Sequence, residues 1–351
     1  MAEDSAARMK PVMDATARIL VTGANGFVGR HLIAHLLAEE ADSRILAAVH
    51  GAHAQELSQP APDFPEAAGW PGGDAGGRIR ADGLDVCDAG QVDALLQEFC
   101  PQQIYHLAAR ASGADADREA LFAVNVGGTR HVLEAAARLS ELPRVLLVST
   151  GYVYGNTDPE HPAREEDPLA PTVRYGLYTD SKIEMEAVAR DFPGLALIVR
   201  AFAHTGPGQI ESYAVPAFAR QLARIERGLE PPVLRVGNLE ARRDLLDVRD
   251  VVCAYALLMR HGVSGRVYNV ASGRPIRMRE VLDRLRGFCP VTTEVTVDPA
   301  RLRPADIACS TGDASRLRAE TGWQPSRTLD QTLRATLDYW RAQKSGLPAG
   351  P

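Results

Sequence analysis

Two side chains spaced four residues apart offer acid–base chemistry in the middle of the chain. Tyr178 and Lys182 belong to the run Tyr178-Thr179-Asp180-Ser181-Lys182, and on a helix this spacing places them one above the other on the same face. A free tyrosine has a pKa near about 10, and a neighbouring ammonium group lowers that pKa by stabilising the phenolate. We therefore predict that Tyr178 exchanges a proton with a substrate oxygen while hydride moves at the adjacent carbon.

A predicted strand that ends in two hydroxyl residues precedes this pair. Residues 145–148 are apolar, and Ser149 and Thr150 follow them directly. Either hydroxyl can hydrogen-bond the same substrate oxygen as Tyr178. A tyrosine and a lysine four residues apart are a common coincidence on protein surfaces. The order of strand, hydroxyls and pair is what favours a catalytic role for Thr150, Tyr178 and Lys182. Ser149 lacks the context of a nucleophile elbow, so hydrolysis is not expected.

A glycine-rich loop near the amino terminus is spaced to hold a phosphate. Residues 22–29 read TGANGFVG, between an apolar run at 19–21 and an amphipathic stretch at 27–39. Gly23 permits a tight turn, Gly26 lets the backbone approach a pyrophosphate, and Gly29 lets the helix pack closely on the sheet. Backbone N–H groups at the helix start then hold the anion. The pattern predicts a dinucleotide-binding loop with contacts from Gly23, Asn25, Gly26, Phe27, Val28 and Gly29.

The end of the second predicted strand, at 45–49, bears on which dinucleotide is bound. An acidic residue at that edge would accept the ribose hydroxyls and favour NAD, but the residue that follows is His50. No arginine comes immediately after it to attract a 2′-phosphate. We predict NADP as the cofactor, with NAD as the alternative. Asp85, beside Val86, is placed to meet the adenine amine, although it could equally cap the next helix.

The elements that must position these groups alternate along the chain. Further short apolar runs, predicted as strands, lie at 104–108, 145–149 and 196–199, and helical spacing occurs at 91–99 and 129–139. Alternation of this kind indicates an α/β fold, a doubly wound parallel Rossmann sheet with helices on both faces. After Arg200 the chain breaks into short elements punctuated by prolines, until a predicted helix at 250–259 and a strand at 267–270 return to the sheet.

This pattern predicts a body and a cap. We assign residues 18–200, with 244–274 returning, to an NAD(P)-binding Rossmann domain, and residues 201–243 and 275–341 to a smaller mixed cap that binds the substrate. Residues 1–17 and 342–351 are predicted tails, the first of them disordered. Within an insertion at 51–80, the stretch 59–77 is rich in Gly, Pro and Ala and too long for an ordinary connection. It is either a surface insertion or a mobile flap.

Composition excludes several classes of protein. The 351 residues are 45% hydrophobic and 24% charged, with a net charge of −6 and no segment that concentrates Lys and Arg. Nucleic acid and anionic membranes are therefore not expected as partners, since both require a basic surface. The five dispersed cysteines indicate buried thiols in a reducing cytoplasm. The nine histidines show no metal-ligand spacing, and no apolar run is long enough to span a bilayer.

Taken in order, these motifs resemble the extended short-chain dehydrogenase/reductase family from about Arg18 to Trp340. The matching pieces are the phosphate loop, the runs His106-Leu107-Ala108-Ala109 and Asn125-Val126-Gly127-Gly128-Thr129, and the Tyr178/Lys182 pair. The resemblance implies a sugar-nucleotide cap and a homodimer joined by a four-helix bundle. It also implies further cofactor contacts at His50, Asp85, Val86, Leu107, Ala108, Ala109, Asn125, Ser149, Tyr178 and Lys182.

The carboxyl-terminal half is similar to the GDP-mannose branch of that family. The matching segments are 204–209, 238–239, 243–244, 247–250, 301–306, 312–313 and 321–325. Arginines in this region suit a sugar diphosphate, because a guanidinium fork binds phosphate well. Asp306 could accept hydrogen bonds from guanine or simply neutralise an arginine. The expected substrate contacts are Ser112, Thr150, Tyr152, His204, Arg235, Asn238, Leu239, Arg243, Arg303 and Asp306.

Three positions depart from the branch pattern. Dehydratases of this branch carry Glu two residues after the active-site Thr, where this chain has Tyr152, which argues against 4,6-dehydration. Ala203 replaces an Asn common in the reductases, and Leu177 replaces the Pro often found before the catalytic Tyr. Ala203 and Tyr152 leave the exact substrate or stereochemistry open, but not the class of chemistry.

The resemblance implies NAD(P)H-dependent reduction of the C4 keto group of a nucleotide-linked 4-keto-6-deoxyhexose. The expected reaction converts GDP-4-keto-6-deoxy-D-mannose to GDP-D-rhamnose or its C4 epimer. One alternative is a nucleotide-sugar 4-epimerase with tightly bound NAD, which would use the same residues. Another is a dinucleotide sensor without activity, against which the intact Tyr178/Lys182 pair argues.

Overall fold

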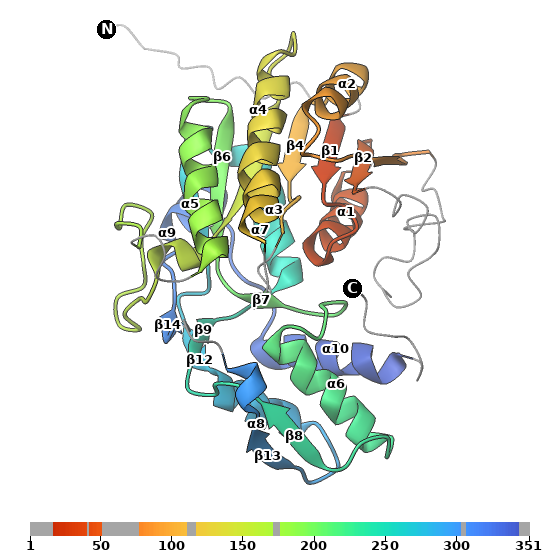
Figure 1. The fold of residues 1–351 in the computed structure, drawn as a ribbon, viewed down its shortest axis with the longest axis vertical. Helices are drawn as coiled ribbons and strands as arrows, with labels where there is room; N and C mark the ends of the chain where they lie inside the picture. Colours follow the sequence, from red (N-terminus) through yellow and green to blue (C-terminus); the bar gives the residue numbers. More distant parts are fainter. Residues whose placement is uncertain are drawn as a thin grey trace, which may run out of the picture.

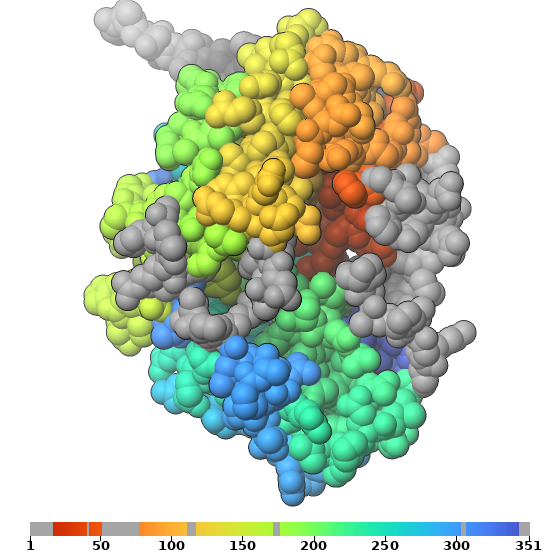
Figure 2. Space-filling view, viewed as in Figure 1, coloured from red at the N-terminus to blue at the C-terminus, as the bar shows by residue number. Residues whose placement is uncertain are grey.

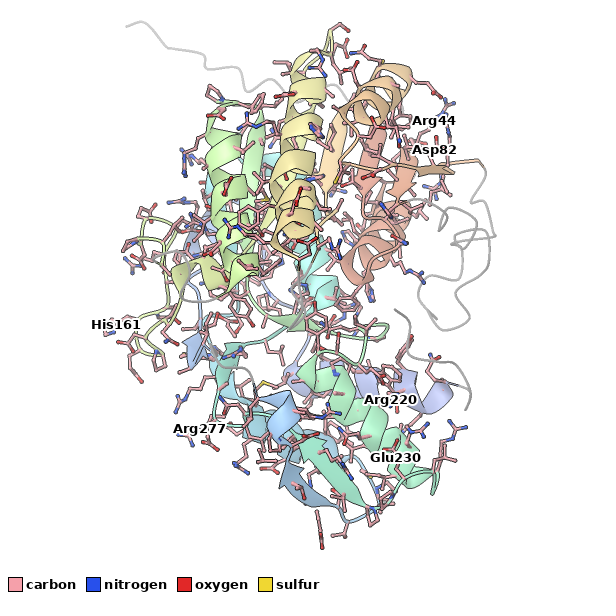
Figure 3. All side chains as sticks on the ribbon, viewed as in Figure 1. Arg44, Asp82, His161, Arg220, Glu230 and Arg277 are labelled. Atoms are coloured by element: carbon pink, nitrogen blue, oxygen red, sulfur yellow. The ribbon has the colours of Figure 1, made fainter. Side chains whose placement is uncertain are left out.

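The computed structural model describes residues 17–40, 42–50, 77–110, 117–170, 176–302 and 307–343. A sheet with helices on both faces forms the upper half of Figure 1, and a smaller mixed region forms the lower half. The space-filling view shows red to yellow residues, with light green ones beside them, over the upper part of one face, and darker green to blue residues over the lower part (Figure 2). Charged side chains such as Arg44, Arg220 and Glu230 project from both parts (Figure 3).

The central sheet has seven parallel strands in the order β11-β6-β5-β4-β1-β2-β3. Registered neighbours such as Leu46, Leu20, Ile104 and Val145 place one apolar row across four strands. The predicted Rossmann fold is confirmed. The strands are β1 (Arg18–Thr22), β2 (Arg44–Val49), β3 (Ile79–Gly83), β4 (Gln103–His106), β5 (Arg144–Thr150), β6 (Ala196–Ala201) and β11 (Val267–Val270).

Strand β3 was not among the strands expected from the sequence. Its residues, IRADG, contain no apolar run, because β3 lies at the edge of the sheet and most of its side chains reach solvent. The strand predicted at 104–108 is also shorter than expected, since β4 ends at His106.

Helices cover both faces of the sheet because alternate residues of each strand point to opposite sides. Ile19 and Val21 pack in one core cluster with α1 (Phe27–Glu39) and α7 (Val248–His261), whereas Leu20 packs in another. That second cluster includes side chains of α2 (Ala89–Phe99), α4 (Thr129–Ala137) and α5 (Leu177–Arg190). Helix α3 (Arg118–Phe122) leads through the π-helical turn η4 (Ala123–Gly128) into α4.

A third core cluster lies in the lower half of the molecule. It joins α6 (Ala214–Glu226), α8 (Met278–Gly287), α10 (Leu329–Ala342), β8 (Val233–Val236) and β13 (Glu294–Val297). Short strands connect the two halves: β7 (His204–Thr205) pairs with β10 (Leu246–Asp247), and β9 (Arg242–Asp244) pairs with β12 (Pro275–Arg277) and β14 (Cys309–Ser310).

The domain boundaries stay a prediction. Helix α9 (Ser315–Thr321), which that prediction assigned to the cap, packs Leu317 into the core cluster of α1 and α7. Trp323 joins the same cluster, and its indole N–H donates to the Asp250 carbonyl at 3.0 Å. The glycine-rich stretch and both tails lie almost entirely outside the described residues.

Two predictions about composition can be compared with the structure. Within the described residues, no helix is long and apolar enough to cross a membrane. The prediction that the cysteines are buried was largely wrong, because only Cys309 is buried, three cysteines are half-buried and Cys100 is exposed. Cys100 ends α2 in a left-handed conformation, with φ of 48°, at the surface of the sheet body.

Candidate active site

The residues with predicted chemistry gather at the carboxyl edge of the parallel sheet. Thr22 ends β1, His106 ends β4, and Thr150 ends β5. Parallel strands place these ends along one edge, which is where open α/β sheets bind their ligands. Helices α1 and α5 begin at the same edge, so the glycine loop and Tyr178 face a common region.

The glycine loop leaves no room for side chains at two of its three glycines. Gly23 has φ of +67°, and an added Cβ would lie 2.8 Å from the Ala108 nitrogen. A Cβ on Gly29 would lie 2.5 Å from the Gly23 oxygen. Within α1, all of which is described, no side chain caps the amino terminus and no acidic residue occupies the first turn. This cradle fits a dinucleotide pyrophosphate, because backbone N–H groups remain for an anion.

A buried histidine ties the glycine loop to its neighbours, a contact that sequence reasoning missed. His106 Nδ1 lies 2.8 Å from Thr22 Oγ1, and its Nε2 lies 3.1 Å from Thr129 Oγ1. Thr22 Oγ1 also accepts the N–H of Ala108 at 3.1 Å. Burial lowers the pKa of His106 to about 3, so the ring is neutral. The ends of β1 and β4 and the start of α4 are thereby held together.

The residues expected near the adenosine lie at the ends of β2 and β3. His50 is exposed directly after β2. Asp85 does not cap α2, because Asp88 does so by accepting from the Gly90 and Gln91 N–H groups. The Asp85 carboxylate instead accepts the Cys87 N–H at 2.9 Å. Val86 is buried, and its carbonyl lies 2.9 Å from His131 Nδ1.

The Tyr178/Lys182 pair occupies the first turns of α5. Lys182 is buried, and its Nζ donates to the Val148 carbonyl at 2.8 Å and lies 5.9 Å from the centroid of the Tyr178 ring. Burial lowers the pKa of Lys182 to about 8, while the Glu186 carboxylate opposes that shift.

The prediction that Lys182 lowers the pKa of Tyr178 was wrong for the protein alone. Burial raises the pKa of Tyr178, and the nearby phenols of Tyr213 and Tyr152 raise it further. Burial of the phenol is the largest cause, so the pKa of Tyr178 rises although Lys182 Nζ lies 5.9 Å from the centroid of its ring. Tyr178 consequently holds its proton at neutral pH, which is the state that a proton donor needs.

Asn125 holds α5 from the side, within a π-helical turn of a kind that is frequent at functional sites. Its Nδ2 donates to Ser181 Oγ at 2.9 Å and to the Arg110 carbonyl at 3.1 Å, and its Oδ1 accepts the Arg110 N–H at 2.8 Å. Ser181 lies between Tyr178 and Lys182 in the chain. Asn125 therefore connects the segment after β4, which includes Leu107, Ala108 and Ala109, to the catalytic helix.

The two hydroxyls at the end of β5 have different partners. Ser149 Oγ donates to Glu186 Oε1 at 2.6 Å. Thr150 Oγ1 accepts the Tyr152 N–H at 3.3 Å and so caps the short helix η5 (Gly151–Tyr154). Of the two residues, Thr150 is the one whose hydroxyl proton is not committed to Glu186, which favours it as the donor to a substrate oxygen.

Some of the expected substrate contacts meet beside this site. The Arg243 guanidinium lies 6.0 Å from the centroid of the Tyr152 ring and donates to the Ile307 carbonyl at 2.6 Å. His204 stacks on Phe27 of the glycine loop, with ring centroids 6.2 Å apart and planes at 9°.

Other expected contacts are not brought together. Arg235 is exposed on β8, in a different sheet from the Arg243 strand β9. Leu239 is buried in the third core cluster, and its carbonyl accepts the Arg279 N–H at 2.9 Å. Asn238 accepts the N–H of Glu240. Ser112, Arg303 and Asp306 lie outside the described residues. That Arg235, Arg243 and Arg303 together bind the diphosphate remains a prediction.

Fold and site together define the class: a Rossmann-fold enzyme with a dinucleotide loop and the Tyr–Lys pair of the extended short-chain dehydrogenases/reductases. The chain belongs to the GDP-mannose 4,6 dehydratase family, whose model matches residues 20–336. It is 33% identical over 336 residues to GDP-6-deoxy-D-mannose reductase of Pseudomonas aeruginosa, covering 93% of this chain and 98% of that protein. It is 28% identical to dTDP-6-deoxy-L-talose 4-dehydrogenase (NAD(P)(+)) of Kitasatospora kifunensis, covering 94% and 97%.

Solved structures agree with these matches. RMD from Pseudomonas aeruginosa, complexed with NADPH, superposes with a TM-score of 0.76 at 31% identity, covering 93% of this chain and 99% of that one. UDP-glucose 4-epimerase of Thermus thermophilus, in complex with NAD, gives 0.74 at 27% identity, with coverage of 93% and 99%. The predicted family, fold and enzyme class, an NAD(P)-dependent sugar-nucleotide enzyme, are confirmed.

Proposed function

We propose that this enzyme uses NADPH to reduce the C4 keto group of GDP-4-keto-6-deoxy-D-mannose and forms GDP-D-rhamnose. The observation that carries the proposal is the 33% identity to GDP-6-deoxy-D-mannose reductase over 98% of that protein. The residue at position 152 supports it. Dehydratases of this branch carry a glutamate there to remove a proton from the sugar, and Tyr152 carries no carboxylate to do so.

The residues of the site fit this reaction. Gly23, Gly26 and Gly29 would hold the pyrophosphate of the dinucleotide at the start of α1, and its nicotinamide, when bound, would supply the hydride for C4. Tyr178, which burial keeps protonated, gives its proton to the C4 oxygen. Thr150 donates a hydrogen bond to that oxygen. Because oxygen is protonated as hydride arrives, no free alkoxide forms.

The resemblance supports three finer proposals. We infer that the base is guanine, that the enzyme is a homodimer, and that it acts in the cytoplasm. Sedimentation of the purified protein tests the second of these, and a monomer at micromolar concentration would contradict it. Arg243, beside Tyr152, is the arginine that we place on the diphosphate side of the substrate.

The direct test is turnover of the proposed substrate. Purified protein is mixed with GDP-4-keto-6-deoxy-D-mannose and NADPH, loss of NADPH absorbance is followed, and NMR of the product gives the configuration at C4. We expect one NADPH consumed for each hexose formed. If no NADPH is consumed while a known reductase turns over the same substrate batch, the proposal is wrong. If the product were the C4 epimer, the reaction would still be a reduction of the C4 keto group, but hydride would have reached the opposite face of the sugar ring.

A second candidate is a nucleotide-sugar 4-epimerase that keeps NAD bound through its cycle. The similarity to UDP-glucose 4-epimerase of Thermus thermophilus favours it, at 27% identity over 93% of this chain. Such an enzyme would carry NAD through gel filtration and interconvert C4 epimers without net consumption of cofactor. Purified protein that releases no NAD on denaturation, and that needs added NADPH for turnover, would exclude this candidate.

A further inference from the structure

We propose that Glu186, paired with Arg200, is a positioning residue that locks the catalytic helix α5 to the end of strand β5. The pair would keep Tyr178 and Lys182 in place relative to Thr150. This inference rests on the function proposed above.

Glu186 is fully buried, one helical turn after Lys182 and two turns after Tyr178. Its carboxylate accepts the Ser149 hydroxyl at 2.6 Å. One turn earlier, Lys182 Nζ donates to the Val148 carbonyl at 2.8 Å. Two consecutive residues of β5 are therefore bonded by two successive turns of α5, and Thr150 comes next along the strand. Attachment at two points prevents the helix from sliding along the strand.

Arg200, on the neighbouring strand β6, binds the Glu186 carboxylate and holds it in place. Its Nε and Nη2 donate to the two carboxylate oxygens of Glu186 at 3.0 and 2.7 Å. Its Nη1 donates to the Tyr154 hydroxyl at 2.8 Å and to the Glu165 carbonyl at 3.1 Å. Tyr154 belongs to η5, the short helix that follows Thr150. The guanidinium thus holds both the carboxylate and the segment that leaves the catalytic strand.

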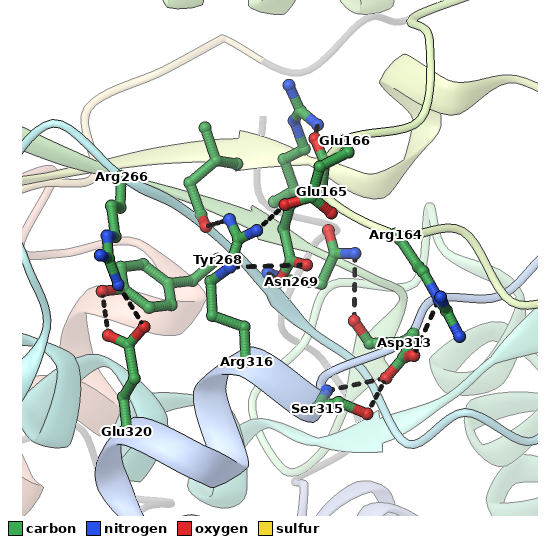
Figure 4. A network of polar contacts seen from close by, with 12 residues as sticks. Arg164, Glu165, Glu166, Arg266, Tyr268, Asn269, Asp313, Ser315, Arg316 and Glu320 are labelled. Atoms are coloured by element: carbon green, nitrogen blue, oxygen red, sulfur yellow. Dashed lines mark hydrogen bonds and ion pairs between the residues drawn. The ribbon is translucent and has the colours of Figure 1, made fainter.

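The groups that bind Arg200 are themselves hydrogen-bonded, and this network extends to the surface of the molecule. The Tyr154 hydroxyl donates to Asn269 Oδ1 at 2.9 Å, and Glu165 Oε1 accepts the Asn269 N–H at 2.9 Å. Figure 4 shows Glu165 and Asn269 beside Arg316 of α9, whose guanidinium also pairs with Glu166. A buried ion pair adds little net stability compared with well-packed apolar residues. Net stability is therefore a weak explanation for this network, and its contacts with the catalytic strand are the observation that points to positioning.

Glu186 also acts on Lys182 through its charge. Among the described residues, the titratable groups that interact with Lys182 are Tyr178 and Glu186 of α5 and His106 of β4. His106 is neutral, because burial lowers its pKa to about 3. Glu186 is therefore the group that opposes the effect of burial and raises the pKa of Lys182. Without that charge, Lys182 would lose its proton at a lower pH.

The test compares three variants with the wild-type enzyme. Glu186→Gln keeps the shape and removes the charge; Glu186→Gln with Arg200→Met removes both charges and leaves no unpaired buried guanidinium. Asp250→Asn is the matched control, since this buried carboxylate accepts from Ser326 Oγ at 2.7 Å and from the Arg327 N–H at 3.0 Å, outside the catalytic edge. Each variant is measured for Tm, kcat, both KM values and the pH profile of kcat.

We expect Glu186→Gln to lower kcat by about 10- to 100-fold, because small displacements of catalytic groups have effects of this size, while both KM values change little. Only the ammonium form of Lys182 can donate a hydrogen bond to the nicotinamide ribose, so the alkaline limb of the kcat profile should move down by about one pH unit, the effect of losing a nearby opposite charge. The double variant should regain stability and keep both defects. Asp250→Asn should lower Tm and leave the pH profile at its wild-type position.

Two results would overturn the proposal. A double variant that regains stability together with wild-type kcat and pH profile would show that the pair is only structural. An unchanged pKa of Lys182 in Glu186→Gln, followed by NMR of the lysine side chain without any substrate, would overturn the part of the proposal in which Glu186 acts on Lys182 through its charge. That second measurement also separates the two proposals, because it tests this effect of Glu186 even if the wild-type enzyme fails to reduce the keto sugar.

Discussion

Replacing Gly23 by alanine tests the cofactor cradle at its tightest approach between loop and strand. The backbone of Gly23 has φ of +67°, a conformation that costs a residue with a Cβ about 1–2 kcal/mol. The new Cβ would also lie 2.8 Å from the Ala108 nitrogen and 2.9 Å from the Leu107 carbonyl carbon. Both neighbours are backbone atoms of the residues just after β4, so the loop itself must move away by a few tenths of an ångström or more.

The strain in the backbone and the displacement of the loop are detected by different measurements. The backbone strain should lower the free energy of unfolding by about 1–2 kcal/mol. Displacement of the N–H groups that face the pyrophosphate should weaken NADPH binding by at least about tenfold, which corresponds to about 1.4 kcal/mol. Isothermal titration calorimetry measures the Kd for NADPH, and urea unfolding measures the stability of the protein alone.

Gly287→Ala is the matched control. Gly287 ends α8, and a Cβ there would meet no atom within 4 Å. The control should bind NADPH as the wild-type enzyme does. If Gly23→Ala also bound NADPH with wild-type affinity, the loop would not be the pyrophosphate cradle, and the placement of the dinucleotide at α1 would be refuted.

Three further predictions address the chemistry and the ligands. Tyr178→Phe should lower kcat by about 10²–10⁴-fold, because it removes the proton donor, with NADPH affinity nearly unchanged; more than a tenth of the wild-type kcat would disprove the assignment. NADPH should be used at least as well as NADH, since His50 stands where an acid would repel the 2′-phosphate; a kcat/KM for NADH far above that for NADPH would contradict this. GDP should raise Tm clearly more than dTDP or UDP at equal concentration, by ligand linkage, because a buried base-reading contact left unpaired is costly. Equal shifts in Tm with all three nucleotides would mean that the pocket recognises the phosphates and not the base.

The spacing of residues along the chain was enough to predict those parts of the site that lie within a single structural element. Three glycines between a strand and a helix predicted the phosphate loop, and the structure places a left-handed φ at Gly23, where only glycine is free of strain. The spacing of Tyr178 and Lys182 predicted their common helix, since residues four apart share a face. The edge strand β3 was not predicted from the sequence because solvent reaches its side chains, so its residues carry no apolar pattern.

Contacts between distant elements were decided only by the tertiary structure. Ser149 and Glu186 are 37 residues apart, and His106 and Thr129 are 23 apart, so no motif spacing joins them. The direction of the Tyr178 pKa shift also needed the folded chain. Spacing brings an ammonium group near the phenol, but the burial of that phenol in the folded chain determines the direction of the shift. Sequence patterns encode periodicity along one element, whereas burial and charge depend on which elements pack together.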